Sequence, residues 1–158
     1  MTNYKYLGVT IDNKLDWHLH TSLLHKKVNK RLFFLRKLKY FKIEKPLMSM
    51  FYHSTIESMI NFCITAWAGN TRHQDKEKLN RVIRKACKIT TSTFPYIDEL
   101  YIIACTRKIS SILLDNQHPL FPQITISTRS NRPRLLICNK ERYRRSFLPS
   151  SIKLLPSS

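Results

Sequence analysis

The strongest constraint on the fold is a run of apolar residues that recurs at three- and four-residue steps between residues 17 and 38. Its members are Trp17, Leu24, Val28, Leu32, Leu35 and Leu38. This spacing predicts one face of an α-helix, which we expect to be capped by Asp16 and to end near Tyr40. The opposite side carries Lys26, Lys27, Lys30, Arg31, Arg36 and Lys37. The helix is therefore expected to be apolar on one face and cationic on the other.

A second helix is predicted to begin at Pro46, whose fixed φ suits the first helical turn, and to end near Trp67, before Gly69-Asn70. Its expected apolar face consists of Met48, Phe51, Tyr52, Thr55, Met59, Phe62 and Cys63. We interpret Cys63 and Cys87 as core thiols, because the sequence shows no base paired with either sulfur.

A third helix is predicted to start with Asp75 as its N-cap and to bury one apolar face. The residues of that face are Leu79, Val82, Ile83 and Ala86. Arg81, Arg84, Lys85 and Lys88 follow at i, i+3, i+4 and i+7 and so share another face. A fourth helix is predicted after Pro95, with Asp98 and Glu99 in its first turn, where negative charge is favourable, and it should extend to about Asp115.

The two ends of the chain differ from this helical middle. Near the N-terminus, Tyr4, Tyr6, Val9 and Ile11 alternate around Gly8, and Asp12-Asn13 is a turn signal, which together predict a short hairpin or edge strand. After His118 the chain is rich in Pro and Arg, and only Ser150 to Leu155 is predicted to be helical. The predicted fold is mainly α: a β-element at 1–16, a core of about four helices at 17–115, and an extended basic tail at 116–158.

The charge of the chain points to a polyanionic partner. Against 28 Lys and Arg there are only 10 Asp and Glu, a formal net charge of +18. The basic residues are spread over the chain, and the apolar stretch from Met59 to Trp67 is short and broken by Asn61, so no membrane contact is expected. No secretory signal is visible, which predicts a cytoplasmic or nuclear protein.

We therefore expect the phosphate backbone of RNA or DNA to be the partner, although cationic helix faces are often only solvated surface. The candidate binding residues are Lys26, Lys27, Lys30, Arg31, Arg81, Arg84, Lys85, Lys88, Arg129, Arg132, Arg134, Arg142, Arg144 and Arg145. If each of Arg81, Arg84 and Lys85 neutralises a phosphate, reversing all three charges should flatten the slope of log affinity against log salt by about three. Tyr143 and Phe147 either stack on unpaired bases or hold the tail against the core.

Other chemistries find weaker support. Only Gly8 and Gly69 are glycines, which excludes glycine-rich phosphate loops, and no cofactor is expected. The histidines at 18, 20 and 25 are interpreted as solvated surface and not as metal ligands. Trp17 and Trp67 are expected to anchor helix ends in the core, with base stacking as the alternative.

Several segments together resemble the C-terminal part of the reverse transcriptase of LINE-type (non-LTR) retrotransposons. YKYLGVTIDNKLDWHLH at the N-terminus is similar to that family's primer grip, with Tyr6, Leu7 and Gly8 as the matching residues. KKVNKRLFFLRKL, FYHSTIESMINFCITAW and KLNRVIRKACKI resemble the thumb helices that follow. HPLF and NKERYRRSFLPSSIKLL are similar to the tail that closes many such reading frames. The resemblance implies a thumb-like bundle whose palm domain belongs to a longer parent.

The same resemblance implies that the chain does not polymerise. The family's YxDD motif supplies paired aspartates for Mg²⁺ and should precede the primer-grip segment. Tyr96-Ile97-Asp98-Glu99 imitates the motif, but it follows that segment and begins a helix. We expect a non-catalytic remnant that retains sequence-tolerant nucleic-acid binding; the alternative is a decayed translation product with no cellular role.

A second resemblance is to a region catalogued as the N-terminal segment of an AlkB-type tRNA-modifying protein. An AlkB-type oxygenase needs two His and one carboxylate around iron on a strand-rich scaffold. His73, Asp75 and His118 are of the residue types that such an iron site needs, and Arg129 could bind a carboxylate. A nearly glycine-free helical chain does not supply the scaffold, so no metal site and no oxygenase activity are expected.

Overall fold

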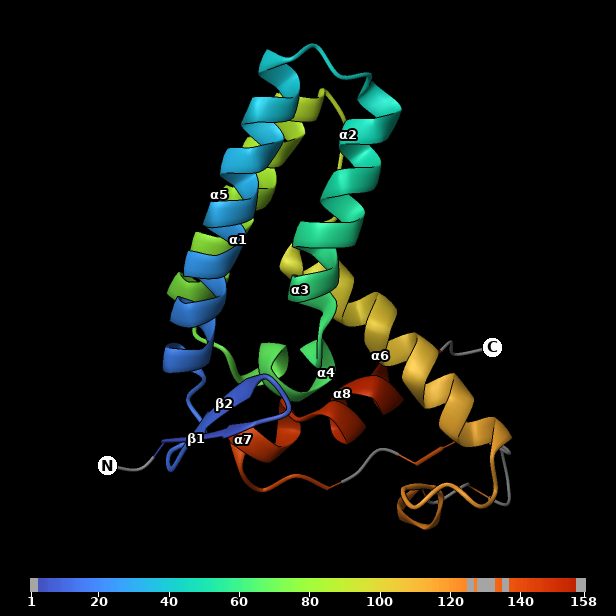
Figure 1. The fold of residues 1–158 in the computed structure, drawn as a ribbon. Coiled ribbons are helices and arrows are strands. Elements are labelled where there is room, and N and C mark those ends of the chain that lie inside the picture. Colours follow the sequence, from blue (N-terminus) through green and yellow to red (C-terminus); the bar gives the residue numbers. More distant parts are fainter. Residues whose placement is uncertain (1–2, 125–126, 128–132, 135–136, 156–158) are drawn as a thin grey trace.

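A two-stranded antiparallel hairpin leads into the first long helix (Figure 1). The computed structural model describes residues 3–124, 127, 133–134 and 137–155. Strand β1 (Asn3–Tyr6) pairs with β2 (Val9–Asp12), so the predicted hairpin is confirmed. The turn lies at Leu7-Gly8, where φ is 43° and 85°, and two positive φ values are typical of a tight hairpin turn. Asp12-Asn13 instead begins the link to the first helix.

Helix α1 (His18–Tyr40) confirms the long amphipathic helix. Its inward residues Leu24, Val28, Leu32 and Leu35 are all buried. The predicted cap is wrong by one residue. Trp17 occupies the N-cap position with a left-handed backbone (φ 64°), while Asp16 Oδ1 accepts a hydrogen bond from the His18 N–H at 2.9 Å.

The predicted second helix is interrupted. It consists of α2 (Lys45–Tyr52), the π-helical turn η1 (His53–Glu57) and α3 (Ser58–Asn61). A break then precedes α4 (Ile64–Trp67) and the 3₁₀ turn η2 (Ala68–Asn70). At the break Phe62 is extended and Cys63 is left-handed with φ 51°, so the chain changes direction there.

This interruption changes which residues enter the core. Because a π turn holds more residues than an α turn, the buried positions follow at four-residue steps. They are Met48, Tyr52, Ile56, Ile60 and Ile64. The predictions that Phe62 and Cys63 lie on the apolar face are therefore wrong, since both are exposed. Cys87 is half-buried.

Helices α5 (His73–Thr90) and α6 (Ile97–Leu114) confirm the third and fourth predicted helices. Helix α5 buries the four residues expected of it, Leu79, Val82, Ile83 and Ala86. Its N-cap is Arg72 and not Asp75, which lies in the first turn. In α6 the Glu99 carboxylate accepts a hydrogen bond from the Tyr96 N–H at 3.3 Å, so the YxDD-like residues form a helix start.

Helices α1 and α5 lie side by side and run in the same direction, and α2–α3 runs back beside them (Figure 1). His18 meets Asp75 near the start of both helices, and Lys39 Nζ contacts the Lys88 carbonyl oxygen near their ends. The main hydrophobic core lies between these helices. Both Trp17 and Trp67 are buried in it, as expected, and the Trp67 Nε1–H donates to the Phe62 carbonyl.

The described part of the tail packs on α6. It contains the 3₁₀ turn η3 (Phe121–Gln123), α7 (Glu141–Arg144) and α8 (Phe147–Lys153). Helix α8 starts three residues before the predicted helical segment, and α7 was not predicted. A second apolar cluster joins the tail to α6 and consists of Ile109, Ile112, Ile124, Leu148 and Ile152. None of the described helices is long and apolar enough to span a membrane.

Candidate nucleic-acid interface

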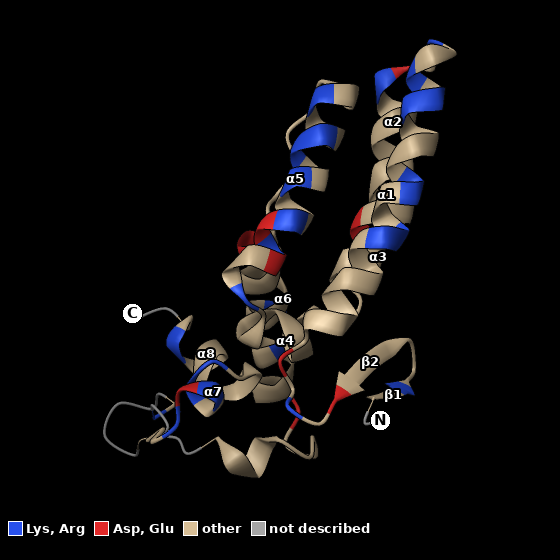
Figure 2. Cartoon of the chain, turned by 90° about the vertical axis from the view of Figure 1, so that its left-hand side faces the viewer, with Lys and Arg blue, Asp and Glu red and all other residues tan. Residues whose placement is uncertain are grey.

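Basic residues recur along most of the length of α1 (Figure 2). Lys26, Lys27, Lys30 and Arg31 are all exposed, and Arg36, Lys37 and Lys39 continue the charge toward the C-terminal end of the helix. The chain has no acidic residue between His18 and Ile43. Among the residues that the structure describes, no ion pair involves a Lys or Arg of α1. These cations are therefore available to an external anion.

The cationic stripe of α5 is placed as predicted but is partly paired. Arg81, Arg84, Lys85 and Lys88 are all exposed. Glu77 on the same helix pairs with Arg84, and its Oε1 lies 3.9 Å from the Arg81 Nε. The Arg84 hydrogen bond lowers the pKa of Glu77, so this carboxylate stays charged. Two of the four stripe cations thus share an internal counter-ion.

The two cationic helices meet along a seam. Burial lowers the pKa of His25 of α1, and the positive charges of Lys78 and Lys85 of α5 lower it further. Farther along, Lys39 Nζ lies 3.4 Å from the Lys88 carbonyl oxygen. The seam therefore brings some cations of the two helices close together, with Lys78 and Lys85 near His25 and Lys39 beside Lys88.

The tail contributes less free charge than its sequence suggests. Arg134, Arg142, Arg144 and Arg145 are exposed. Glu141 pairs with both Arg144 (3.0 Å) and Arg145 (2.8 Å). Arg129 and Arg132 lie outside the described residues.

The two tail aromatics differ in their environment. Phe147 packs against the second apolar cluster, and Lys108 Nζ lies 5.4 Å from its ring centroid. Of the two expected roles for Phe147, this contact favours holding the tail against the core. Tyr143 is exposed.

The primer-grip-like residues form the exposed tip of the hairpin. Leu7 is solvent-exposed, and a side chain at Gly8 would touch the ring of Phe62. A hollow of about 360 Å³ lies between the hairpin, α1 and α3. Its lining includes Lys5 and Lys27, so it borders the cationic side of α1.

His18, His20 and His25 lie in three different environments. His20 is buried between the rings of Trp17 and Trp67, at centroid distances of 6.2 and 5.6 Å, so its predicted solvated position is wrong. The hairpin folds over it, and its Nδ1 accepts the Thr10 N–H at 3.3 Å. Burial lowers the pKa of His20. His18 contacts Asp75, and His25 contacts Asn29.

The residues of the oxygenase-like triad lie on different elements. Asp75 is only 2% exposed, and its two carboxylate oxygens contact His18 Nδ1 (2.8 Å) and Lys78 Nζ (2.9 Å). Burial acts to raise the pKa of Asp75, but these two partners hold it below its usual range. His73 is exposed at the start of α5, whereas His118 follows α6. Within the described part of the chain, no group of three or more His, Cys, Asp or Glu side chains could hold a metal ion.

Sequence reasoning missed four exposed aromatic residues on and just after α1. They are Phe33, Phe34, Tyr40 and Phe41. Lys37 Nζ lies 5.6 Å from the ring centroid of Phe33 and 5.9 Å from that of Tyr40. Their exposure could have been predicted from the sequence, because all four fall outside the apolar spacing that defines the buried face of α1.

Comparison with known proteins finds a family match for part of the chain. The family model described as "Alkylated DNA repair protein alkB homolog 8, N-terminal" matches residues 17–58. This range contains α1, α2 and η1, including the cationic side of α1, and it contains neither His73 nor His118. No curated protein and no solved structure matches the chain. Over these residues, the chain is thus similar to an AlkB-homologue N-terminal region.

Proposed function

We propose that the protein binds RNA or DNA through the phosphate backbone, with the outward side of α1 as the main contact. The observation that carries the proposal is the set of seven Lys and Arg on α1 with no acidic residue on the helix and no described ion pair. Cations that have no carboxylate partner within the protein gain most from an external polyanion, because binding then breaks no existing ion pair. Binding of this kind is tolerant of sequence and weakens as salt rises.

The proposed origin is the thumb of a non-LTR retrotransposon reverse transcriptase that has lost its catalytic palm. The support is the motif resemblance along the chain, together with the order of elements, a hairpin followed by a basic long helix and an antiparallel return. The family model that matches residues 17–58 is described as part of a DNA repair protein, which supports a nucleic-acid role for the segment that contains α1. As a non-catalytic remnant, the protein would bind nucleic acid without extending a primer.

The direct test compares charge removal on the two helices. One variant changes Lys26, Lys27, Lys30 and Arg31 to Gln, and its matched control changes Arg81, Arg84 and Lys85 to Gln. If each α1 cation neutralises a phosphate, the slope of log affinity against log salt should flatten by about three to four in the first variant. The control should flatten it by about one, because Glu77 already pairs with Arg81 and Arg84.

Fluorescence anisotropy with labelled RNA and DNA oligonucleotides over a salt series measures both slopes. Circular dichroism checks that each variant keeps its helix content. A parent protein that fails to bind at low salt, or a folded α1 variant with the parent's slope, would contradict the proposal.

A further inference from the structure

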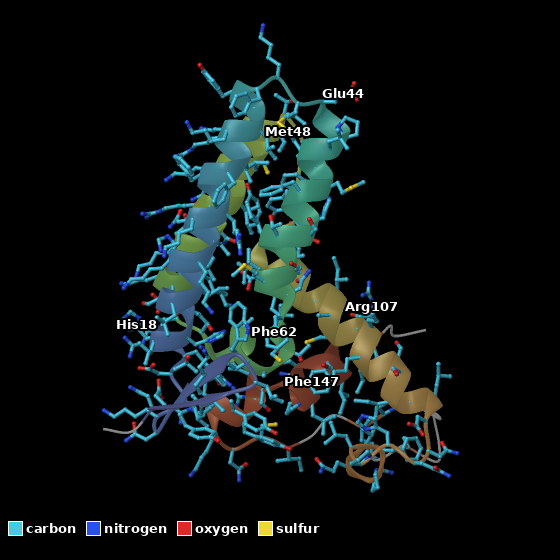
Figure 3. All side chains as sticks on the ribbon, viewed as in Figure 1. His18, Glu44, Met48, Phe62, Arg107 and Phe147 are labelled. Carbon is cyan, nitrogen blue, oxygen red and sulfur yellow. The ribbon has the colours of Figure 1, made fainter. Side chains whose placement is uncertain are left out.

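Five exposed residues form a straight line along α1, which we call the α1 stripe. They are Lys26, Lys30, Phe33, Lys37 and Tyr40. Their spacing of four, three, four and three residues keeps them on one side of the helix. Phe33 is 52% exposed and Tyr40 is 77% exposed, so most of the aromatic surface is open to solvent. Figure 3 shows long side chains with nitrogen ends projecting from this part of α1.

The rings of the α1 stripe are supported by neighbouring aromatic side chains. Phe34 packs edge-on against Phe33, with centroids 5.8 Å apart and planes at 74°. Phe41 packs in the same way against Tyr40, at 5.4 Å and 76°. The Lys37 ammonium lies between the two supported rings, within cation–π distance of both. The stripe therefore alternates positive charge with supported aromatic surface.

This alternation favours one class of partner. An anionic membrane suits a helix whose rings are segregated from its cations, because the rings enter the apolar layer. Here, burying the rings would also bury the Lys37 ammonium between them, which is unfavourable. A single nucleic-acid strand offers phosphates and free base faces in turn along its length. In a duplex the base faces are already stacked and cannot reach side-chain rings on a helix surface.

We infer that the α1 stripe binds unpaired nucleotides of single-stranded RNA or DNA. The bases stack on Phe33 and Tyr40, while Lys26, Lys30 and Lys37 contact the phosphates. The seven-residue separation places the two rings about 10 Å apart along the helix, room for a short strand segment between two stacked bases. The inference rests on the proposed function, since it names the form of nucleic acid that the cationic side of α1 prefers.

The first experiment compares a single-stranded oligonucleotide with a duplex of equal length and at equal salt. Phe33→Ala and Tyr40→Ala are each expected to weaken single-strand binding by about tenfold, with little effect on the duplex. Leu114→Ala is the matched control, because Leu114 is a highly exposed apolar residue at the far end of α6. It should bind both forms as the parent does, and circular dichroism should show the same helix content in all variants.

A second readout reports stacking directly. The natural tryptophans, Trp17 and Trp67, are buried, so Tyr40→Trp places an exposed fluorophore on the α1 stripe. Single-stranded oligonucleotide should quench its emission, while duplex at the same occupancy should leave the emission largely unchanged.

The outcomes separate the inference from the proposed function. If the parent binds neither form, the proposed function fails and the inference fails with it. If both forms bind with a salt slope that depends on α1 cations, but the ring variants bind as the parent does, only the inference is overturned. Two further results would also overturn it: a change in sedimentation mass on ring substitution, which assigns the rings to a second copy, or a Tyr40→Trp emission response to anionic vesicles and not to oligonucleotides.

Discussion

Helices α1 and α5 run side by side in the same direction, and both are basic, yet they differ in how their charge is used. Helix α1 has seven Lys and Arg and no acidic residue. Helix α5 has six, of which four pair with carboxylates in the structure. These pairs are Lys76 with Asp98, Lys78 with Asp75, and Arg81 and Arg84 with Glu77. Within the described part of the chain, the cations of α1 are therefore free of carboxylate partners, whereas most cations of α5 already form ion pairs within the protein.

The difference shows that net charge and helical spacing do not by themselves identify a binding face. Both helices carry cations at spacings that share a face, which is why both were predicted to bind nucleic acid. A cation already paired must lose its partner before it gains a phosphate, so its contribution to binding is smaller. The positions of acidic residues decide which of two similar stripes is the stronger candidate.

The largest expected effect concerns a third basic region, the tail, whose docking depends on Gly69. A side chain at Gly69 would collide with the Arg145 carbonyl oxygen and would come within 2.8 Å of the Tyr101 hydroxyl. Gly69→Ala should lower the free energy of unfolding by about 3 kcal/mol, because the tail must shift from the core. Urea denaturation measures the loss. If α1 carries the binding, oligonucleotide affinity at low temperature should stay near that of the parent; a large fall would move the interface toward the tail.

The next effect tests the joint between the two compared helices. Asp75→Asn removes the buried carboxylate that contacts His18 of α1 and Lys78 of α5. We expect the free energy of unfolding to fall by about 1–2 kcal/mol, since the buried group loses charge-assisted hydrogen bonds. Glu141→Gln is the control, because this exposed carboxylate pairs with two exposed arginines and should contribute little. Equal losses in both variants would contradict the structural role of Asp75.

A smaller effect is expected when paired cations of α5 are released instead of removed. Glu77→Gln releases Arg81 and Arg84 from their shared carboxylate. If the seam brings nucleic acid within reach of α5, the salt slope should steepen by up to about two, and affinity at low salt should rise. Glu57→Gln, which removes a carboxylate paired with His53 on the α2–α3 side, should leave the slope unchanged. A Glu77→Gln protein with the parent's slope would confine the interface to α1.

The smallest effect is a pH dependence that arises from α1 itself. Burial lowers the pKa of His20 and His25 below their ordinary value of 6.5. Between the lowered and ordinary pKa values the unfolded chain binds more protons, so stability is complete above about pH 6.5 and falls as pH drops below it. His20→Gln should flatten this fall, as measured by urea denaturation at several pH values. An unfolding free energy that rises on acidification through this range would contradict the assignment.

The pKa of His25 can also show whether nucleic acid binds at the seam between α1 and α5. Lys78 and Lys85 also lower the pKa of His25. Phosphates bound there would offset both lysines, so bound nucleic acid should raise the pKa of His25 measured by NMR. An unchanged pKa in the complex would place the bound strand away from the seam.

Local patterns in the sequence were sufficient for most of the helical framework. The spacing from Trp17 to Leu38 predicted α1 and its buried face, and Pro46, Pro95 and the acidic pair at 98–99 marked where other helices begin. These features work from sequence because helix spacing and first-turn charge depend on neighbours only a few residues away. The exposure of the candidate cations on α1 and α5 followed from the same reasoning.

The tertiary structure alone decided the features that depend on residues distant in the chain. A π turn and a break at Phe62-Cys63 moved the core face to Ile56, Ile60 and Ile64, and the hairpin buried His20 beneath Thr10. Packing also left the rings of the α1 stripe uncovered. Side-chain burial and charge pairing depend on which elements meet, and one short-range pattern fits several such arrangements. The sequence by itself therefore determined that the chain is helical and cationic, and the fold decided which of its cations and rings face an external partner.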